Sequence, residues 1–167
     1  MLSKSNWSSK IDDIYFMKKA IKLAQKAYDI GEVPIGAVVV APDGKIIGRG
    51  YNLVEKNNNP LAHAELFAIA KAAKKIGDWR LEGCSIYVTL QPCGMCFHAV
   101  GVSRCSRLVY GAESPLFGYP LDSVNGIQIY KKHVEEIVGG VCGEQAAKLL
   151  KCFFKKRRIE KGDRDEK

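Results

Sequence analysis

The sequence predicts an α/β protein in which helices pack on a central sheet. Apolar residues recur at helical spacing near both ends of the chain, and runs rich in β-branched residues lie between them. In the middle of the chain, a strand, a helix and a second strand follow one another, as in parallel strands joined by a crossover helix. At 167 residues, we expect one domain over 1–167, with a core at about 12–158 and a basic tail at about 155–167.

The N-terminal half is expected to begin with a helix, continue with a hairpin and end with a second helix. Asp12 or Asp13 can cap the first helix, and Gly31 ends it. A Pro-Asp-Gly turn at 42–44 joins the two strands of the hairpin. Gly77 ends the second helix, which follows a polar loop. The expected ranges are about 12–30 (helix), 35–41 and 45–50 (strands), 52–59 (loop) and 62–76 (helix).

The C-terminal half is expected to alternate strands and helices. A strand, a helix and a strand at this spacing predict a parallel pair of strands. A long irregular stretch with two prolines, Phe117 and Tyr119 follows, and loops of this length are often functional. The expected ranges are about 84–90 (strand), 92–102 (helix), 107–110 (strand), 114–125 (loop), 134–138 (strand) and 144–158 (helix).

The most informative motif is His63-Ala64-Glu65, followed 28 residues after Glu65 by Cys93-Gly94-Met95-Cys96. A structural zinc is normally bound by four Cys or His side chains, whereas a catalytic zinc takes three and leaves the fourth position to water. His63, Cys93 and Cys96 make three ligands. Glu65 is not expected to join His63 on the metal, because residues two apart on a helix diverge by about 200°. The motif therefore predicts one catalytic zinc ion per subunit, with Glu65 free to move a proton.

Both halves of the motif are expected at helix N-termini. Pro92 suits the first turn of a helix, which would place Cys93 and Cys96 in or beside that turn. The unpaired N–H groups of a helix start favour the thiolates that a metal requires. Coordination lowers the pKa of water from about 15.7 toward 7, which supplies a nucleophile at neutral pH.

Neither half of the motif identifies a metal site by itself. His-x-Glu occurs in many helices, and Cys-x-x-Cys can be a redox pair, half of a zinc knuckle or two buried thiols. The combination, in this order and with proline before the first cysteine, favours a metal site. Haem attachment is disfavoured because His98 falls one residue too late. The remaining thiols lie among apolar neighbours and are expected in the core, namely Cys84, Cys105, Cys142 and Cys152.

Composition and charge suggest where the chain works and what it binds. Residues 1–10 are polar and the longest apolar run is only seven residues, so we expect no secretory signal, no membrane partner and a cytoplasmic location. Six cysteines without an export signal agree with a reducing compartment. Of the net charge of +8, residues 148–167 contribute +5 through nine Lys or Arg against four Asp or Glu.

The basic tail has two interpretations that can both hold. Phe153 and Phe154 precede four consecutive cations at 155–158, and rings beside cations bind single-stranded nucleic acid by stacking and phosphate contacts. Alternatively, the end is a solvated basic helix whose apolar stripe, including Ala146 and Phe153, faces the core.

With these motifs placed, the chain resembles the zinc-dependent nucleobase deaminase superfamily and, within it, the bacterial tRNA-specific adenosine deaminases. The similarity runs from about Phe16 to Arg158. The metal motifs are typical of the whole superfamily, whereas the opening strand and the Phe-Phe tail are typical of the tRNA branch. The matching segments are 32–38, 50–52, 62–65, 87–90, 92–96 and 153–158.

The resemblance implies a three-layer, cytidine-deaminase-like fold with a central mixed five-stranded sheet flanked by helices. It implies a homodimer that converts the wobble adenosine of a tRNA anticodon to inosine. His63, Cys93 and Cys96 would hold zinc, and Glu65 would shuttle protons. The residues expected to contact the substrate are Asn52, Ala64, Pro34, Phe153, Phe154 and Arg157.

Two positions depart from the family pattern. Gln91 stands where the family usually has Glu before Pro-Cys, and the run Glu113–Phe117 replaces a stretch that usually carries an Asp. That loop helps relatives to grip the nucleotide. The leading hypothesis is hydrolytic deamination of adenosine in tRNA. The alternatives are deamination of a free cytosine, cytidine or guanine-type substrate, and a non-catalytic zinc module that binds RNA.

Overall fold

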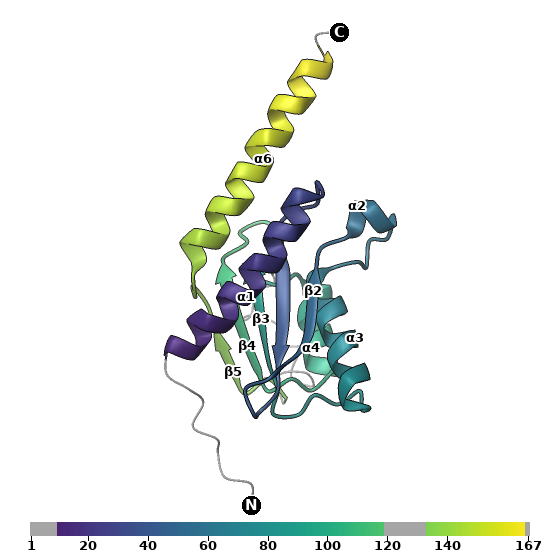
Figure 1. Ribbon diagram of the computed structural model, residues 1–167, viewed down its shortest axis with the longest axis vertical. Helices are drawn as coiled ribbons and strands as arrows, with labels where there is room; N and C mark the ends of the chain where they lie inside the picture. The colour runs from purple at the N-terminus through teal and green to yellow at the C-terminus, as the bar shows by residue number, and fades with distance from the viewer. Residues whose placement is uncertain (1–9, 119–132, 166–167) are drawn as a thin grey trace, which may run out of the picture.

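The computed structural model describes residues 10–118 and 133–165, which form a sheet with helices on both faces (Figure 1). Helix α1 and the first turns of α6 lie on one face, and helices α3 and α4 cover the other. This arrangement confirms the predicted three-layer α/β architecture. The elements are α1 (Lys10–Asp29), β1 (Gly36–Val40), β2 (Ile46–Tyr51), α2 (Val54–Asn57), α3 (Ala64–Ile76), β3 (Ser85–Leu90), α4 (Gly94–Val102), β4 (Arg107–Ala112), β5 (Glu136–Val138) and α6 (Gly143–Asp165).

The five strands form one mixed sheet in the order β2-β1-β3-β4-β5. Strand β1 pairs antiparallel with both β2 and β3, and the β1–β2 pair is the predicted hairpin. Strand β3 pairs parallel with β4, and α4 is the crossover between them, which confirms the predicted parallel pair of strands joined by a helix. Strand β5 extends the parallel part of the sheet. The carboxyl ends of β3 and β4 therefore meet at the same edge.

Alternation along β1 divides the core into two layers. Val38 and Val40 face α1 and pack with Met17 in one cluster. Ala37 and Val39 point to the opposite face and pack against the helices α3 and α4. All four strand residues are almost completely buried. Because both faces are covered, β1 consists of small and β-branched apolar residues with no polar alternation.

Glycines let the helices approach the sheet closely. A Cβ on Gly36 would lie 2.1 Å from the backbone oxygen of Ala20 in α1. On the other face, a Cβ on Gly48 would lie 2.0 Å from the backbone oxygen of Ala68 in α3. These separations are far below van der Waals contact, so neither position has room for a side chain. Helices α1 and α3 therefore rest directly on the backbones of β1 and β2.

A buried ion pair fastens α1 to β4. Arg107 donates from Nη1 to Asp13 Oδ1 over 2.6 Å and from Nη2 to Asp13 Oδ2 over 3.0 Å. The Tyr87 hydroxyl donates to the same carboxylate over 2.9 Å. Arg107 also donates from Nε to Glu136 of β5. Burial raises the pKa of Asp13, but the hydrogen bonds from Arg107 and Tyr87 and the arginine charge outweigh it and lower the pKa.

Several boundaries differ from those expected. Helix α1 begins at Lys10 rather than Asp12, and α6 continues to Asp165, seven residues past the expected end. The short helix α2 lies inside the stretch expected to be loop. Of the expected loop at 114–125, residues after Gly118 lie outside the described part of the chain. Across residues 10–118 and 133–165, no helix is long and apolar enough to cross a membrane.

Candidate metal centre

The first turns of α3 and α4 bring three potential metal ligands together. His63, Cys93 and Cys96 each offer one donor atom, and these atoms all lie within 4.8 Å of one another. His63 Nδ1 is 3.8 Å from Cys93 Sγ and 3.4 Å from Cys96 Sγ. Among the described residues, this is the one group of three or more such side chains placed to share a metal ion.

The spacing of these atoms fits zinc. With Zn–S bonds of about 2.3 Å and Zn–N bonds of about 2.0–2.1 Å, tetrahedral geometry places sulfur and nitrogen ligands about 3.6 Å apart. The two observed distances between His63 Nδ1 and the sulfurs, 3.8 and 3.4 Å, lie on either side of that value. Three convergent protein donors leave one tetrahedral position for solvent or substrate, as in catalytic zinc sites.

Local backbone geometry sets the positions of the ligands. His63 is the N-cap of α3 and Cys93 is the N-cap of α4, both in extended conformation. Cys96 follows in the first turn of α4. The prediction that Pro92 lies in the first helical turn is wrong, because α4 begins at Gly94. Pro92 instead lies in the segment between β3 and α4, directly before the N-cap Cys93.

The charges of the two thiols show why a cation suits the site. Hydrogen bonds from Cys96 and His63 lower the pKa of the Cys93 thiol to about 4. The pKa of Cys96 is raised, because its thiol donates to Cys93 and is buried. The protein alone therefore stabilises one thiolate of the pair and opposes the second. A divalent cation removes that opposition, since both thiolates then have a positive partner.

Glu65 lies beside the cluster but is not part of it. Its side chain is 4 % exposed, and within the described structure its Oε2 atom has no hydrogen-bond partner. Burial raises the pKa of Glu65, and the nearby charge of Cys93 adds to the increase. A buried carboxyl oxygen without a partner is unusual in a folded protein, because its desolvation is not offset. Such a position suits a carboxyl group whose hydrogen-bond partner is supplied by a bound substrate or metal-bound solvent.

Three residues expected to contact a nucleotide, Ala64, Asn52 and Pro34, are buried. Ala64 is the first residue of α3, between the ligand His63 and Glu65, and its side chain is fully buried. Asn52 follows β2 and is 5 % exposed. The next residue, Leu53, donates its backbone N–H to Ala62 over 3.0 Å, which ties this segment to the start of α3. Pro34 is buried before β1.

The three tail residues expected to bind RNA lie in different surroundings. Phe153 is 5 % exposed, and its ring lies 5.9 Å from that of Tyr28 in α1. Phe154 is 45 % exposed on the other side of α6. Arg157 donates from Nη2 to the backbone oxygen of Gly31 over 2.9 Å and covers the Phe153 ring at 5.5 Å. Of the three, Phe153 is thus covered, whereas Phe154 and Arg157 keep much of their side chains in solvent.

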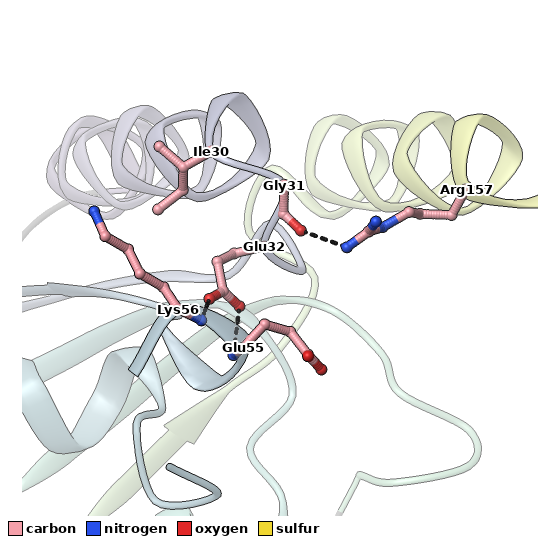
Figure 2. A pocket seen from close by; sticks show the side chains of 6 residues that line it. All are labelled: Ile30, Gly31, Glu32, Glu55, Lys56 and Arg157. Atoms are coloured by element: carbon pink, nitrogen blue, oxygen red, sulfur yellow. Dashed lines mark hydrogen bonds between the residues drawn. The ribbon is translucent and has the colours of Figure 1, made fainter. Parts of the chain in front are cut away.

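Glu32, to which the sequence analysis assigned no role, is buried and lies beside Asn52. Glu32 is 1 % exposed and accepts hydrogen bonds from the side chain of Asn52 and from the backbone N–H groups of Glu55 and Lys56. Glu32 lines a cavity of about 510 Å³ between the segment after α1, helix α2 and Arg157 of α6, and Figure 2 shows its carboxylate facing the backbone of α2. The available signal was an acidic residue in an apolar stretch just before β1.

Gln91, which replaces the usual glutamate, connects the metal segment to the loop after β4. Its side-chain oxygen Oε1 accepts the backbone N–H of Ser114 over 3.1 Å. Its backbone N–H donates to Ala112 over 2.8 Å. A carboxylate could accept the same bond from Ser114, so the substitution changes the charge at this position and preserves the acceptor.

Comparison with known proteins agrees with this geometry. Residues 10–112 match the family described as the cytidine and deoxycytidylate deaminase zinc-binding region. The chain is 46 % identical to a tRNA-specific adenosine deaminase of Bacillus subtilis, over 90 % of this chain and 92 % of that one. It is 42 % identical to the protein of the same name from Haemophilus influenzae, over 89 % and 87 % of the two chains.

A solved structure supports the same relationship. It comes from a study of A-to-I editing by tRNA:A34 deaminases at the wobble position of transfer RNA. The structure superposes with a TM-score of 0.75 at 38 % identity and covers 81 % of this chain and 99 % of that chain. The similarity thus extends over the fold that carries the metal cluster.

Proposed function

The chain belongs to the zinc-binding cytidine and deoxycytidylate deaminase family, and on that premise we propose that it converts adenosine in tRNA to inosine by hydrolytic deamination. The observation that carries this proposal is the convergence of three metal donors beside the buried carboxyl group of Glu65, one oxygen of which has no hydrogen-bond partner in the described structure. Zinc is the cofactor, held by His63, Cys93 and Cys96. The relatives at 38–46 % identity that are named for tRNA support the choice of substrate.

The chemistry requires a nucleophile and a group that moves protons. When bound to the three ligands, zinc supplies an acidified water as the nucleophile at neutral pH. Glu65 would take one proton from that water and deliver it to the ring nitrogen, and would then take the proton of the new hydroxyl on carbon-6 and deliver it to the amine, so that the C–N bond breaks and ammonia leaves inosine. Burial raises the pKa of the Glu65 carboxyl, which makes its carboxylate a stronger proton acceptor.

The substrate base must reach a site recessed between two helix starts. An adenine in a stacked loop has to leave its stack, which costs a few kcal/mol. We propose that Asn52, Pro34 and the backbone at Ala64 contact the extruded nucleotide. Phosphate contacts from the tail, with Phe154 offering a ring for stacking, help to offset the cost of unstacking. In this assignment, Phe153 and Arg157 hold the tail helix in place.

Four finer points belong to the same proposal. The target is the wobble adenosine, as in the study of tRNA:A34 deaminases that yielded the similar structure. Residues 1–167 form a single deaminase domain. Two copies of the chain form a homodimer. The enzyme works in the cytoplasm, where its tRNA substrate is found.

The direct test is to incubate the purified protein with total tRNA and, separately, with free nucleosides, and to measure inosine by mass spectrometry. Inosine from tRNA alone supports the proposal. Deamination of a free base or nucleoside alone would assign the protein to the small-molecule deaminases.

A Glu65→Ala variant provides the matched control. It should retain one zinc per chain and lose turnover by at least about 100-fold, because the proton carrier is gone. Undiminished turnover by this variant would refute Glu65 as the carrier. RNA binding without turnover by the native protein would instead indicate a non-catalytic zinc module.

A further inference from the structure

Three N–H groups converge on the buried carboxylate of Glu32. Asn52 Nδ2 donates to Oε2 over 3.2 Å, and the backbone N–H of Lys56 donates to Oε1 over 2.6 Å. The backbone N–H of Glu55 donates to Oε2 over 3.3 Å. We propose that Glu32 is a positioning residue that fixes the Asn52 side chain for contact with the substrate nucleotide. This role rests on the adenosine deaminase activity proposed above.

Glu32 first holds the backbone that follows Asn52. Helix α2 has only four residues, none of them buried, and its N-cap Leu53 provides no side-chain hydrogen bond. A helix this short does not persist by itself, because nucleation is unfavourable. The Glu32 carboxylate supplies the missing cap from 23 residues away by accepting two backbone N–H groups in the first turn.

Glu32 also determines which way the Asn52 amide faces. An amide side chain has one acceptor oxygen and one NH₂ group with two donors. Because Nδ2 donates to Glu32, the oxygen of Asn52 is held away from the carboxylate and remains an acceptor for another group. The backbone is fixed too, since the Asn52 N–H donates to Ile35 over 3.0 Å. A side chain held in this way requires little further ordering when a nucleotide binds.

The turn that carries Glu32 is anchored by the C-terminal helix. Arg157 of α6 donates to the carbonyl of Gly31, which immediately precedes Glu32 (Figure 2). Glu55 lines the same cavity, but its side chain is exposed and points away from Glu32 in Figure 2. Glu55 therefore offers a charge-matched control, because its removal changes the charge of the cavity without altering the three hydrogen bonds to Glu32.

The test uses the zinc-loaded full chain with tRNA as substrate. In Glu32→Gln, one amide oxygen replaces two carboxylate oxygens and an NH₂ group is turned toward N–H donors, so not all three bonds can form. We expect KM for tRNA to rise about tenfold and kcat to change less than about twofold, because Asn52 binds the nucleotide without touching the reacting atoms. Zinc content should stay at one per chain. Glu55→Gln should match the native protein.

A double-mutant cycle distinguishes positioning from a general loss of structure. If Glu32 acts through Asn52, Asn52→Ala should raise KM by a similar factor, and adding Glu32→Gln should raise it little further. If the two substitutions acted independently, their effects on KM would multiply instead. The proposal is overturned if Glu32→Gln has native KM, or if the two effects multiply.

A measurement on the native protein guards against a variant that does not fold. By NMR, the side-chain NH₂ protons of Asn52 should exchange with solvent more slowly than those of the exposed Asn57 and Asn58. Equal exchange rates would overturn the proposal whether or not the variants fold. Absence of inosine with the native protein would overturn the proposed function. Normal inosine formation by the native protein, together with KM effects of Glu32→Gln and Asn52→Ala that multiply, would overturn the role of Glu32 alone.

Discussion

Gly50 of β2 lies directly against Ala64, the residue between the metal ligand His63 and Glu65. A Cβ on Gly50 would lie 2.0 Å from the backbone oxygen of Ala64. This oxygen belongs to the first turn of α3, so the missing side chain sets how closely the start of the helix approaches the sheet. The position of the metal ligand thus depends on a residue with no chemistry of its own.

A Gly50→Ala substitution should destabilise the protein and disturb the metal site together. The new methyl group meets backbone, which cannot move aside as a flexible side chain would. We expect a loss of at least about 2 kcal/mol in the free energy of unfolding, measured by denaturant titration, with weaker zinc retention after dialysis. Gly162→Ala in α6 is the control, because nothing lies within 4 Å of its Cβ position. Native zinc retention in Gly50→Ala would contradict this account.

Removal of the metal should abolish activity and lower thermal stability. Without a cation, the negative charge on Cys93 and burial disfavour a thiolate at Cys96. Bound zinc therefore stabilises the folded state, to which it binds, relative to the unfolded chain. Treatment with a chelator should lower Tm by several degrees, and added zinc should restore both Tm and inosine formation. Cys96→Ser should not retain zinc, whereas Cys152→Ser should behave like the native protein, because Cys152 is exposed. An unchanged Tm after verified zinc removal would exclude a stabilising role for the metal.

The Asp13–Arg107 pair should be a major contributor to stability. Replacing Asp13 with Asn leaves a buried guanidinium without its full charge partner, for which we expect a loss of about 3 kcal/mol in the free energy of unfolding. The exposed pair between Arg104 and Glu82 is the comparison, and Glu82→Gln should change stability by less than about 1 kcal/mol. Equal effects of the two substitutions would show that burial does not strengthen the first pair.

The same pair should make stability depend on pH in the acid range. Because the folded pKa of Asp13 is lowered, its contribution is fully present above the unfolded pKa of about 3.9 and is lost as pH falls through the folded pKa. Denaturant titrations from pH 6 to pH 2 should therefore show a steeper loss of stability below about pH 4 in the native protein than in Asp13→Asn. Parallel curves for the two proteins would mean that Asp13 does not carry this dependence.

Exposed cations of α6 should contribute to tRNA binding through phosphates. Lys155 and Arg158 are both exposed, so their replacement should not disturb the core. Converting both to Gln should reduce the slope of log affinity against log salt by about 2, as measured by filter binding at several salt concentrations. The control converts Lys74 and Lys75, which lie in the last turn of α3, at the opposite end from His63. A slope unchanged by the tail substitutions would place the phosphate contacts elsewhere.

The sequence predicted the metal cluster because each half of its motif carries a local signal, although the two halves are 30 residues apart. His63 and Cys93 each cap a helix, and short-range spacing fixes Cys96 relative to Cys93. The hairpin and the parallel crossover were also predictable, since continuous runs of β-branched residues indicate strands that are buried on both faces.

The features that escaped prediction depend on contacts between distant residues. Helix α2 is capped by Glu32, which lies 23 residues before Glu55, so no local capping signal marks its start. The covered ring on α6 was predictable, by contrast, because helical spacing placed Phe153 in the core-facing stripe, and the structure confirms that Phe153 is buried against Tyr28 of α1 while Phe154 is exposed.

The length of α6 has a consequence for the size of ligand that the protein can hold. Its 23 residues span about 35 Å, and Figure 1 shows the outer turns continuing past the end of the sheet. A polymer long enough to reach both those turns and the recessed cluster would be tethered at two places, and the second attachment benefits from a high effective concentration. Avidity of this kind favours long RNA over mononucleotides even where the chemistry at the base is the same.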